Sequence, residues 1–379
     1  MGMTARSGRC TTALVAVLVS AVAGTTLTVS PQAARARPST AEHRSFTVSF
    51  TGDLIAHVGI NKRARALAGG TGYDYAPLFG EVQSAIEASD LAICSLEGPI
   101  APAGSRYTGS PVFGSPADIA RSIKAVGYDR CTLATNHSND RGPAGIAATI
   151  DAFDAAGLGH SGSGKSDAGA TAEVFEVNGV RIAHLAYTGG VSGQRRLLTK
   201  TPARVNILSA SRVIADAKDA RLRGAEIVLV SLHWGVEYRR SITDAQQRVA
   251  DAITASGEVD LIAGSHAHVL QPIKQVNGKW VLFGLGNHLS TQNDLTIGRP
   301  STADGVIVTV RFTEQEGGGF AAAQPVVTPT WVHHRKYYIM KVADHLADTS
   351  LPRDVLACLR AAWRRINSLY GGLVEPLPA

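Results

Sequence analysis

Residues 260–272 read "DLIAGSHAHVLQP". The apolar run, residues 261–263, ends at Gly264, and two histidines follow with one small residue between them. The run is typical of a short buried strand. In an extended segment residues i and i+2 point the same way, so both imidazoles, His266 and His268, could face one point. That geometry suits a metal ion. Two unrelated polar loop residues would give the same pattern, so the rest of the chain must decide.

The composition is that of a globular protein. Of 379 residues, 45% are hydrophobic and 18% are charged, which excludes a disordered chain. The net charge is +6, from 37 basic and 31 acidic residues. This balance is too mild to indicate nucleic-acid binding. It permits contact with an anionic envelope polymer.

Residues 1–36 have the pattern of a secretory signal peptide or an N-terminal membrane anchor. Arg6 and Arg9 precede an uncharged stretch at 13–29, and residues 34–36 form a small-x-small cleavage motif. Cleavage there would remove three arginines and leave a net charge of +3. In either case we expect the remainder to be secreted or held in the cell envelope, at the outer face of the cytoplasmic membrane. Residues 37–44 read as a linker.

Strands and helices alternate along the rest of the chain. We expect strands at 45–52, 90–98, 128–136, 226–235, 259–265 and 330–340, helices at 75–90, 115–127, 142–157, 209–223, 243–256 and 351–370, and hairpins turning at Asn178-Gly179 and Asn277-Gly278. This order predicts an α/β protein with two mixed sheets covered by helices. One domain would span 45–345, with a helical tail at 346–379.

Three cysteines remain beyond the N-terminal segment. Cys94 and Cys131 lie in expected buried strands, where a thiol usually behaves as a small apolar side chain. We therefore expect two free thiols, with a disulfide between them as the less favoured alternative. No cysteine cluster has the spacing of a metal site.

Polar side chains recur where the apolar strands end. Successive ends carry Asp53, Glu97, Asn136 with His137 and Asp140, His233 with Glu237, His266 with His268, and Asn287 with His288. Each alone is readily explained as a turn or a helix cap. Together they are the nitrogen and oxygen ligands of divalent metals, at the sheet edge where open α/β folds bind ligands. The sequence therefore predicts a metal site built from several of them.

These residues lie in six motifs that resemble, in order and spacing, the CapA family of bacterial capsule-synthesis proteins associated with poly-γ-glutamate. The motifs are "FTGDLIAH" (50–57), "SLEGPI" (95–100), "ATNHSNDRG" (134–142), "SLHWGVEY" (231–238), "GSHAHVLQPI" (264–273) and "LGNHLS" (285–290). The family is similar in turn to calcineurin-like metallophosphoesterases. That resemblance implies a four-layer αββα sandwich with paired divalent metals, Mn, Fe, Zn or Mg, at its strand ends.

The resemblance also implies residue roles. Glu97 would bridge two ions, Asn136, His233 and His266 would complete one site, and Asp53 and His268 would hold the other. His137 would stabilise charge or donate a proton to the leaving group, and Asp140 could orient its ring, unless Asp140 only favours the start of the next helix. His57, Glu237 and His288 are further candidates for contact with the metals.

The sequence departs from the family pattern at a few positions. Ser95, Thr135 and His288 replace the usual Asn, Asn and Phe, and His57 follows Asp53 by four residues, not two. Three functions remain open. The chain could be an exported capsule or poly-γ-glutamate protein with a metal-dependent hydrolase site, which we favour. It could be a secreted metal-dependent phosphoesterase with no capsule role. The substrate could be an anionic envelope polymer or a small phosphoester or amide. It could be a non-catalytic envelope assembly protein. The first implies membrane-bound capsule-synthesis proteins as partners.

Overall fold

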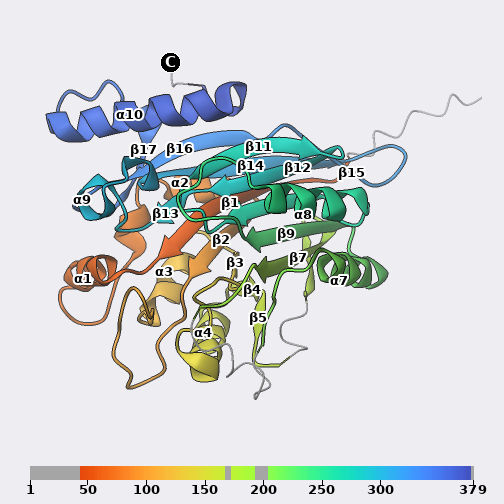
Figure 1. Cartoon of the computed structure of the whole chain (residues 1–379), viewed down its shortest axis with the longest axis horizontal. Coiled ribbons are helices and arrows are strands. Elements are labelled where there is room, and N and C mark those ends of the chain that lie inside the picture. The colour runs from red at the N-terminus through yellow and green to blue at the C-terminus, as the bar shows by residue number, and fades with distance from the viewer. Residues whose placement is uncertain (1–42, 167–171, 193–203, 377–379) are drawn as a thin grey trace, which may run out of the picture. The chain divides into compact units, whose positions relative to one another are not determined.

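A computed structural model describes residues 43–166, 172–192 and 204–376 (Figure 1). The expected signal or anchor at 1–36 lies outside the described residues. From His43 onward the chain forms one compact unit. Among the helices of the described residues, none has the length and apolar character that crossing a bilayer requires.

The first sheet is mixed and contains the strand that starts the domain. Its order is β17 (Ile339–Lys341), β16 (Val326–Val332), β14 (Asp304–Glu314), β1 (Ser45–Ile55), β2 (Leu91–Glu97), β3 (Arg130–Thr132) and β4 (Gly159–Ser161). The strands β13 (Asn287–Leu289) and β15 (Phe320–Ala322) pair with β1 and β14. Strands β1 to β4 run parallel, so their carboxyl ends meet at one edge.

The second sheet is also mixed. Its order is β11 (Leu270–Val276), β12 (Lys279–Leu285), β10 (Leu261–Ser265), β9 (Ile227–His233), β7 (Val180–Thr188) and β6 (Val174–Val177). Its central strands β7, β9, β10 and β12 are parallel. A small ribbon pairs β5 (Ser163–Gly164) with β8 (Arg204–Val205).

Helices cover the outer face of each sheet. The first sheet carries α1 (Val58–Leu67), α2 (Gln83–Glu87), α3 (Asp118–Ala125) and α4 (Gly142–Ala156), and the second carries α7 (Ala210–Leu222) and α8 (Asp244–Ala255) (Figure 1). The short α9 (Asp294–Ile297) precedes β14, and α10 (Arg353–Tyr370) ends the fold. Short 3₁₀ turns lie at Ala76–Phe79, Pro300–Thr302, Val342–His345 and Gly371–Leu373.

Period-two alternation in the strands produces the layers. In β1, Phe46, Val48 and Phe50 point between the sheets, where Leu229 and Leu261 of the second sheet meet them. On the opposite faces, Ala92, Cys94 and Leu96 of β2 join the apolar core under α1 to α4. Val228, Val230 and Leu232 of β9 join the core under α7 and α8. The mixed sheets covered by helices, predicted from the residue pattern, are confirmed. The four-layer αββα arrangement implied by the family resemblance is confirmed as well.

Two expected elements differ from the structure and one helix was not anticipated. The helix expected at 75–90 is interrupted, leaving a 3₁₀ turn at Ala76–Phe79 and the short helix α2 at Gln83–Glu87. The strand expected at 330–340 breaks after Val332, because the chain turns at 333–338. Helix α1 has no side-chain cap and a weakly apolar sequence. It forms because Ile60 and Ala64 are buried against the sheet, a tertiary effect that the local sequence does not reveal.

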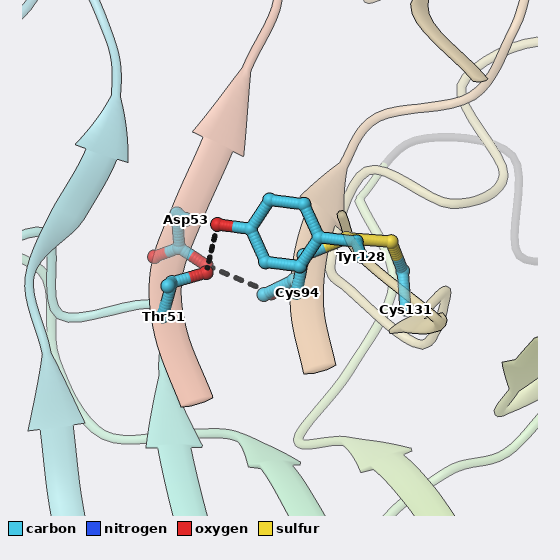
Figure 2. The surroundings of a disulfide bond; sticks show 6 residues. Thr51, Asp53, Cys94, Tyr128 and Cys131 are labelled. Atoms are coloured by element: carbon cyan, nitrogen blue, oxygen red, sulfur yellow. Dashed lines mark hydrogen bonds between the residues drawn. A yellow bond between two sulfur atoms is a disulfide. The ribbon is translucent and has the colours of Figure 1, made fainter. Parts of the chain in front are cut away.

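The cysteines in β2 and β3 form a disulfide, so the expectation of two free thiols is wrong. Cys94 and Cys131 are paired across neighbouring parallel strands, with their Cα atoms 4.4 Å apart, a separation at which a bridge can form. Figure 2 shows the bond beside the ring of Tyr128, whose hydroxyl donates to Thr51 of β1 at 3.0 Å. The sequence showed two buried strands but not that they are neighbours.

Removing this disulfide is expected to destabilise the fold. It closes a loop of 37 residues, so the variant Cys94→Ala/Cys131→Ala should lose about 3–4 kcal/mol of unfolding free energy. Urea unfolding with and without a reductant measures this, and the variant should not respond to the reductant. Free thiols at both positions in non-reducing peptide mapping of the native protein would contradict the assignment.

Helix α10 is joined to the first sheet by a buried ion pair. Arg365 donates to both carboxylate oxygens of Asp304 at 2.6 and 2.7 Å, and Asp304 is 1% exposed. Ile366 and Tyr370 add apolar contact with the core between the sheets. The helix therefore packs on the body of the domain (Figure 1).

Replacing Arg365 with Met should cost about 3–5 kcal/mol, because Asp304 would stay buried without its cation. Arg364, its exposed neighbour on the same helix, provides the matched control. Its replacement by Met should change stability by less than about 0.5 kcal/mol. Equal unfolding midpoints for the two variants in urea would rule out this role.

Candidate metal centre

The polar strand ends of the two sheets converge on one buried cluster. Asp53 lies two residues before the end of β1, Glu97 ends β2 and His233 ends β9. One ligand atom of each lies within 4.8 Å of the other two. All three residues are at most 3% exposed. The cluster exists because the carboxyl ends of both parallel strand sets meet at the same edge.

An irregularity in β1 points Asp53 into this cluster. The pairing with β2 shifts register between Phe50 and Asp53. At Gly52 the backbone approaches so closely that a Cβ atom would lie 2.1 Å from the carbonyl oxygen of Gly286. Only glycine fits there. The Asp53 carboxylate then accepts from Ser95 Oγ at 3.1 Å and from the backbone amide of His266 at 3.0 Å.

The two buried carboxylates have different electrostatics. Burial alone would raise the pKa of Asp53. His268, His233 and the His266 amide outweigh that effect and hold the pKa below its usual value. Burial dominates at Glu97 and raises its pKa to about 7. His268 lies between the two, with Nδ1 3.5 Å from Asp53 and Nε2 3.8 Å from Glu97. Burial lowers the pKa of His268, but the two carboxylates outweigh it and raise that pKa to about 9.

Glu97 supplies the observation that tests whether a cation fits. Its Oε2 is buried and has no hydrogen-bond partner, which is costly for a carboxylate oxygen. Its Oε1 lies 3.8 and 3.9 Å from the Nε2 atoms of His268 and His137. A divalent cation among these oxygen and nitrogen donors would satisfy the unpaired oxygen and offset two buried negative charges. The residues present fit such an ion.

His233 is held in the form that binds metals. Its Nδ1 lies 2.9 Å from Ser265 Oγ, and its Nε2 lies 2.9 Å from Asn136 Oδ1. Burial keeps its pKa well below the usual value, so the imidazole is neutral. His266 packs against His233 with ring centroids 4.7 Å apart, and its Nδ1 is buried without a partner.

The His-x-His pair converges on the cluster, but not as an extended strand. β10 ends at Ser265, and His266 and His268 adopt φ of 89° and 55°. Positive φ is uncommon for a residue with a side chain and occurs in turns and at functional sites. The expectation that extended geometry aims both rings is therefore wrong, although the rings lie 6.0 Å apart beside the same carboxylates.

His137 and Asp140 form a dyad at the edge of the cluster. His137 Nδ1 lies 2.8 Å from Asp140 Oδ2, which also accepts from the backbone amide of Phe113 at 2.7 Å. Burial lowers the pKa of His137, but the hydrogen bond to Asp140 and the charge of Glu97 outweigh it and raise that pKa. Phe113 packs edge-on against the ring at 4.7 Å, a contact with no signal in the sequence.

Two of the three further candidates, His57 and Glu237, lie outside the group of Asp53, Glu97 and His233. His57 precedes α1 and packs 5.5 Å from the ring of Phe113. Burial and the charges of His268 and His137 lower its pKa to about 4. Glu237 is exposed near the rim, where its charge acts on Glu97.

His288 points away from the metal cluster. It is 0% exposed, both ring nitrogens lack partners, and its ring lies 6.1 Å from Phe79 in the core beneath the helices. Its neighbour Asn287 faces the site instead and contacts His268 Nδ1 at 3.1 Å.

A cavity of about 580 Å³ opens beside the cluster. Asn136, His233 and His266 form its polar wall. Most of the remaining lining is apolar and includes Leu208 and Trp234. No lysine or arginine of the described residues lines it. A substrate held at the metal cluster could extend into this space.

A family model described as bacterial capsule synthesis protein PGA_cap matches residues 47–292. The chain belongs to this family. The match covers β1 through β13 and includes every residue of the metal cluster.

Several curated proteins are similar. The chain is 27% identical to "Capsule biosynthesis protein CapA" of Bacillus anthracis over 66% of its length and 61% of that protein. It is 27% identical to "PGA biosynthesis protein CapA" of Bacillus subtilis over 84% of its length and 80% of that protein. A "Probable polyglutamine synthesis accessory protein" of Mycobacterium tuberculosis is 26% identical over 55% of the chain and 58% of that protein.

Among solved structures, the calcineurin-like phosphoesterase YfkN of Bacillus subtilis is 15% identical, with a TM-score of 0.49 over 85% of this chain and 98% of that one. The NAD nucleotidase of Haemophilus influenzae is 10% identical, with a TM-score of 0.46 over 89% of this chain and 65% of that one.

Replacing His288 with Leu should reduce the loss of unfolding free energy that occurs as the pH falls. Complete burial lowers the pKa of His288 to about 3, while an unfolded histidine titrates near about 6.5. Between these values the unfolded state binds more protons, so His288 costs stability as the pH falls, by up to about 1.4 kcal/mol per pH unit.

Urea unfolding between these pH values measures the slope for native and variant protein. The exposed His43, replaced by Leu, is the control. Parallel profiles for His288→Leu and the native chain would contradict the prediction, as would loss of bound metal in the variant.

Proposed function

We propose that the chain is a divalent-metal-dependent hydrolase that acts on a phosphoester or amide bond of an anionic envelope polymer, such as poly-γ-glutamate, during capsule assembly. The observation that carries the proposal is the convergence of Asp53, Glu97 and His233 ligand atoms within 4.8 Å. Family membership supports the capsule context. The site would work at the outer face of the cytoplasmic membrane, beside membrane-bound capsule-synthesis proteins.

The residues that would hold metal are Asp53, Glu97, Asn136, His233, His266 and His268. Divalent cations bound among them would polarise a phosphoryl or carbonyl oxygen and lower the pKa of a bound water. Glu97 would contact both ions if two are bound. Its two oxygens have different surroundings, which supports this role: Oε1 lies near His137 and His268, and Oε2 has no partner. Ser95 and Ser265 would keep Asp53 and His233 oriented.

His137 would donate the proton to the leaving group. Its Nδ1–H donates to Asp140, which leaves Nε2 facing the cluster near Glu97. The raised pKa means that the ring carries a proton at a higher pH than a free histidine does. The fixed carboxylate of Asp140 sets the ring orientation.

Metal analysis combined with activity screening tests the proposal. The purified chain from residue 37 onward should bind about one to two divalent ions at this centre, and should cleave a generic phosphodiester or a γ-glutamyl amide. Asp53→Asn should lower metal occupancy and turnover together. His137→Gln should retain metal and lose about 10²–10⁴-fold in turnover.

His345→Gln, remote from the cluster and paired with Glu81, is the control and should retain both properties. Full turnover in both His137→Gln and Asp53→Asn would overturn the site assignment. Bound metal with polyglutamate binding but no turnover on any substrate would favour the assembly protein over the hydrolase. Phosphodiester turnover in a chain that neither binds polyglutamate nor affects capsule formation would favour a phosphoesterase without a capsule role.

A further inference from the structure

A second group of metal-ligand side chains lies outside this cluster, where α9, β16 and α10 meet. One ligand atom each from Asp294, His334 and Cys358 lies within 4.8 Å of the other two. Cys358 Sγ is 4.0 Å from His334 Nδ1. The three residues come from separate segments of the chain, so their spacing in the sequence does not predict a metal site.

The histidine of this group is buried and incompletely satisfied. His334 is 5% exposed, and its Nε2 has no hydrogen-bond partner. That nitrogen faces Asp354 Oδ2 at 3.7 Å, while the opposite nitrogen faces Cys358. Histidines that bind metals typically direct their second ring nitrogen at a carboxylate, which fixes the tautomer. His334 has this arrangement already.

Space and ligand chemistry are both suitable for an ion. A cavity of about 190 Å³ adjoins the group and is lined by Asp294, Cys358 and Trp331. The neighbouring charge of Arg365 is compensated by its two hydrogen bonds to Asp304. A thiolate, an imidazole and a carboxylate in a tetrahedral zinc site lie roughly 3.3–3.8 Å apart. A small side-chain rotation would bring these three groups to binding distance, with water in the fourth position.

We propose that Asp294, His334 and Cys358 form a second metal site, which takes a zinc-class divalent cation and joins α10 to the end of β16. Cys358 is the free cysteine of the described residues, since Cys94 and Cys131 are paired. The site is independent of the proposed hydrolase centre and would be structural in effect. It would stabilise the helix that closes the core between the sheets.

A cysteine nucleophile activated by His334 and Asp354 is the competing interpretation of the same residues. Cys358 lies inside the α-helix Arg353–Tyr370, where backbone amides are committed to helix hydrogen bonds. Acyl transfer requires free amides or other donors to stabilise an oxyanion. Arg365 lines the same cavity, but it already donates to both carboxylate oxygens of Asp304, so the geometry favours a cation.

Cobalt substitution tests the site by a signal that the first centre cannot give. In the Asp53→Asn/His233→Ala background, with the first centre disabled, Co²⁺ should produce a thiolate-to-cobalt charge-transfer band in the near ultraviolet. Zn²⁺ should displace it, and about one zinc should remain bound per chain. Cys358→Ser and His334→Gln should each abolish the band, and His345→Gln should retain it.

An absent band in the full chain, or equal zinc content with and without Cys358→Ser, would overturn the second site. Neither outcome would contradict the proposed hydrolase activity. Unchanged turnover in Asp53→Asn would contradict that proposal instead. Thermal unfolding gives an independent measurement. Zinc should raise the midpoint of the disabled-centre background but not that of its Cys358→Ser derivative. A rise of equal size in both would also exclude the site.

Discussion

Two buried carboxylates set the conditions for the rest of this structure. Asp53 and Glu97 are almost completely excluded from water, and such groups are stable only when paired or bound to a cation. Neighbouring groups offset part of the cost of burying these carboxylates. Ser95 and the His266 amide donate hydrogen bonds to Asp53, and His268 lies between Asp53 and Glu97. One oxygen of Glu97 still lacks a partner. The hydrogen-bond donors and histidines of the protein therefore compensate the two buried carboxylates only in part, and a bound cation would complete the compensation.

Close backbone contacts position the side chains of the metal centre. Gly52 allows β1 to approach Gly286, and Gly264 in β10 leaves a Cβ position only 2.0 Å from the carbonyl oxygen of Phe283. Both glycines lie one or two residues before a metal-centre residue. The disulfide joins β2 and β3 a few residues before Glu97 and Asn136. The site thus depends on tight contacts within the strands that carry it.

The sequence revealed the layers and the polar strand ends, because apolar alternation and the residues that interrupt it are local signals. It did not reveal the disulfide, which requires knowing that β2 and β3 are neighbours. Helix α1 and the positive φ of His266 and His268 also depend on tertiary contacts. His288 follows Asn287 in the same motif, yet alternation in β13 directs the two side chains to opposite faces. The supporting roles of Ser95 and Ser265 had no distinguishing signal, since serine is common in strand-end turns.

The packing of helix α10 affects how the chain folds. Ile366 and Tyr370 complete the same apolar layer that Phe46 begins, and Tyr370 donates to the carbonyl oxygen of Gln271. The layer between the sheets therefore remains open at one end until the segment that forms α10 docks. Contacts between such distant segments form slowly, because a long loop must close first. Until then the unfolded chain exposes apolar strand surface, so chaperones that bind such surface have their longest opportunity before α10 docks.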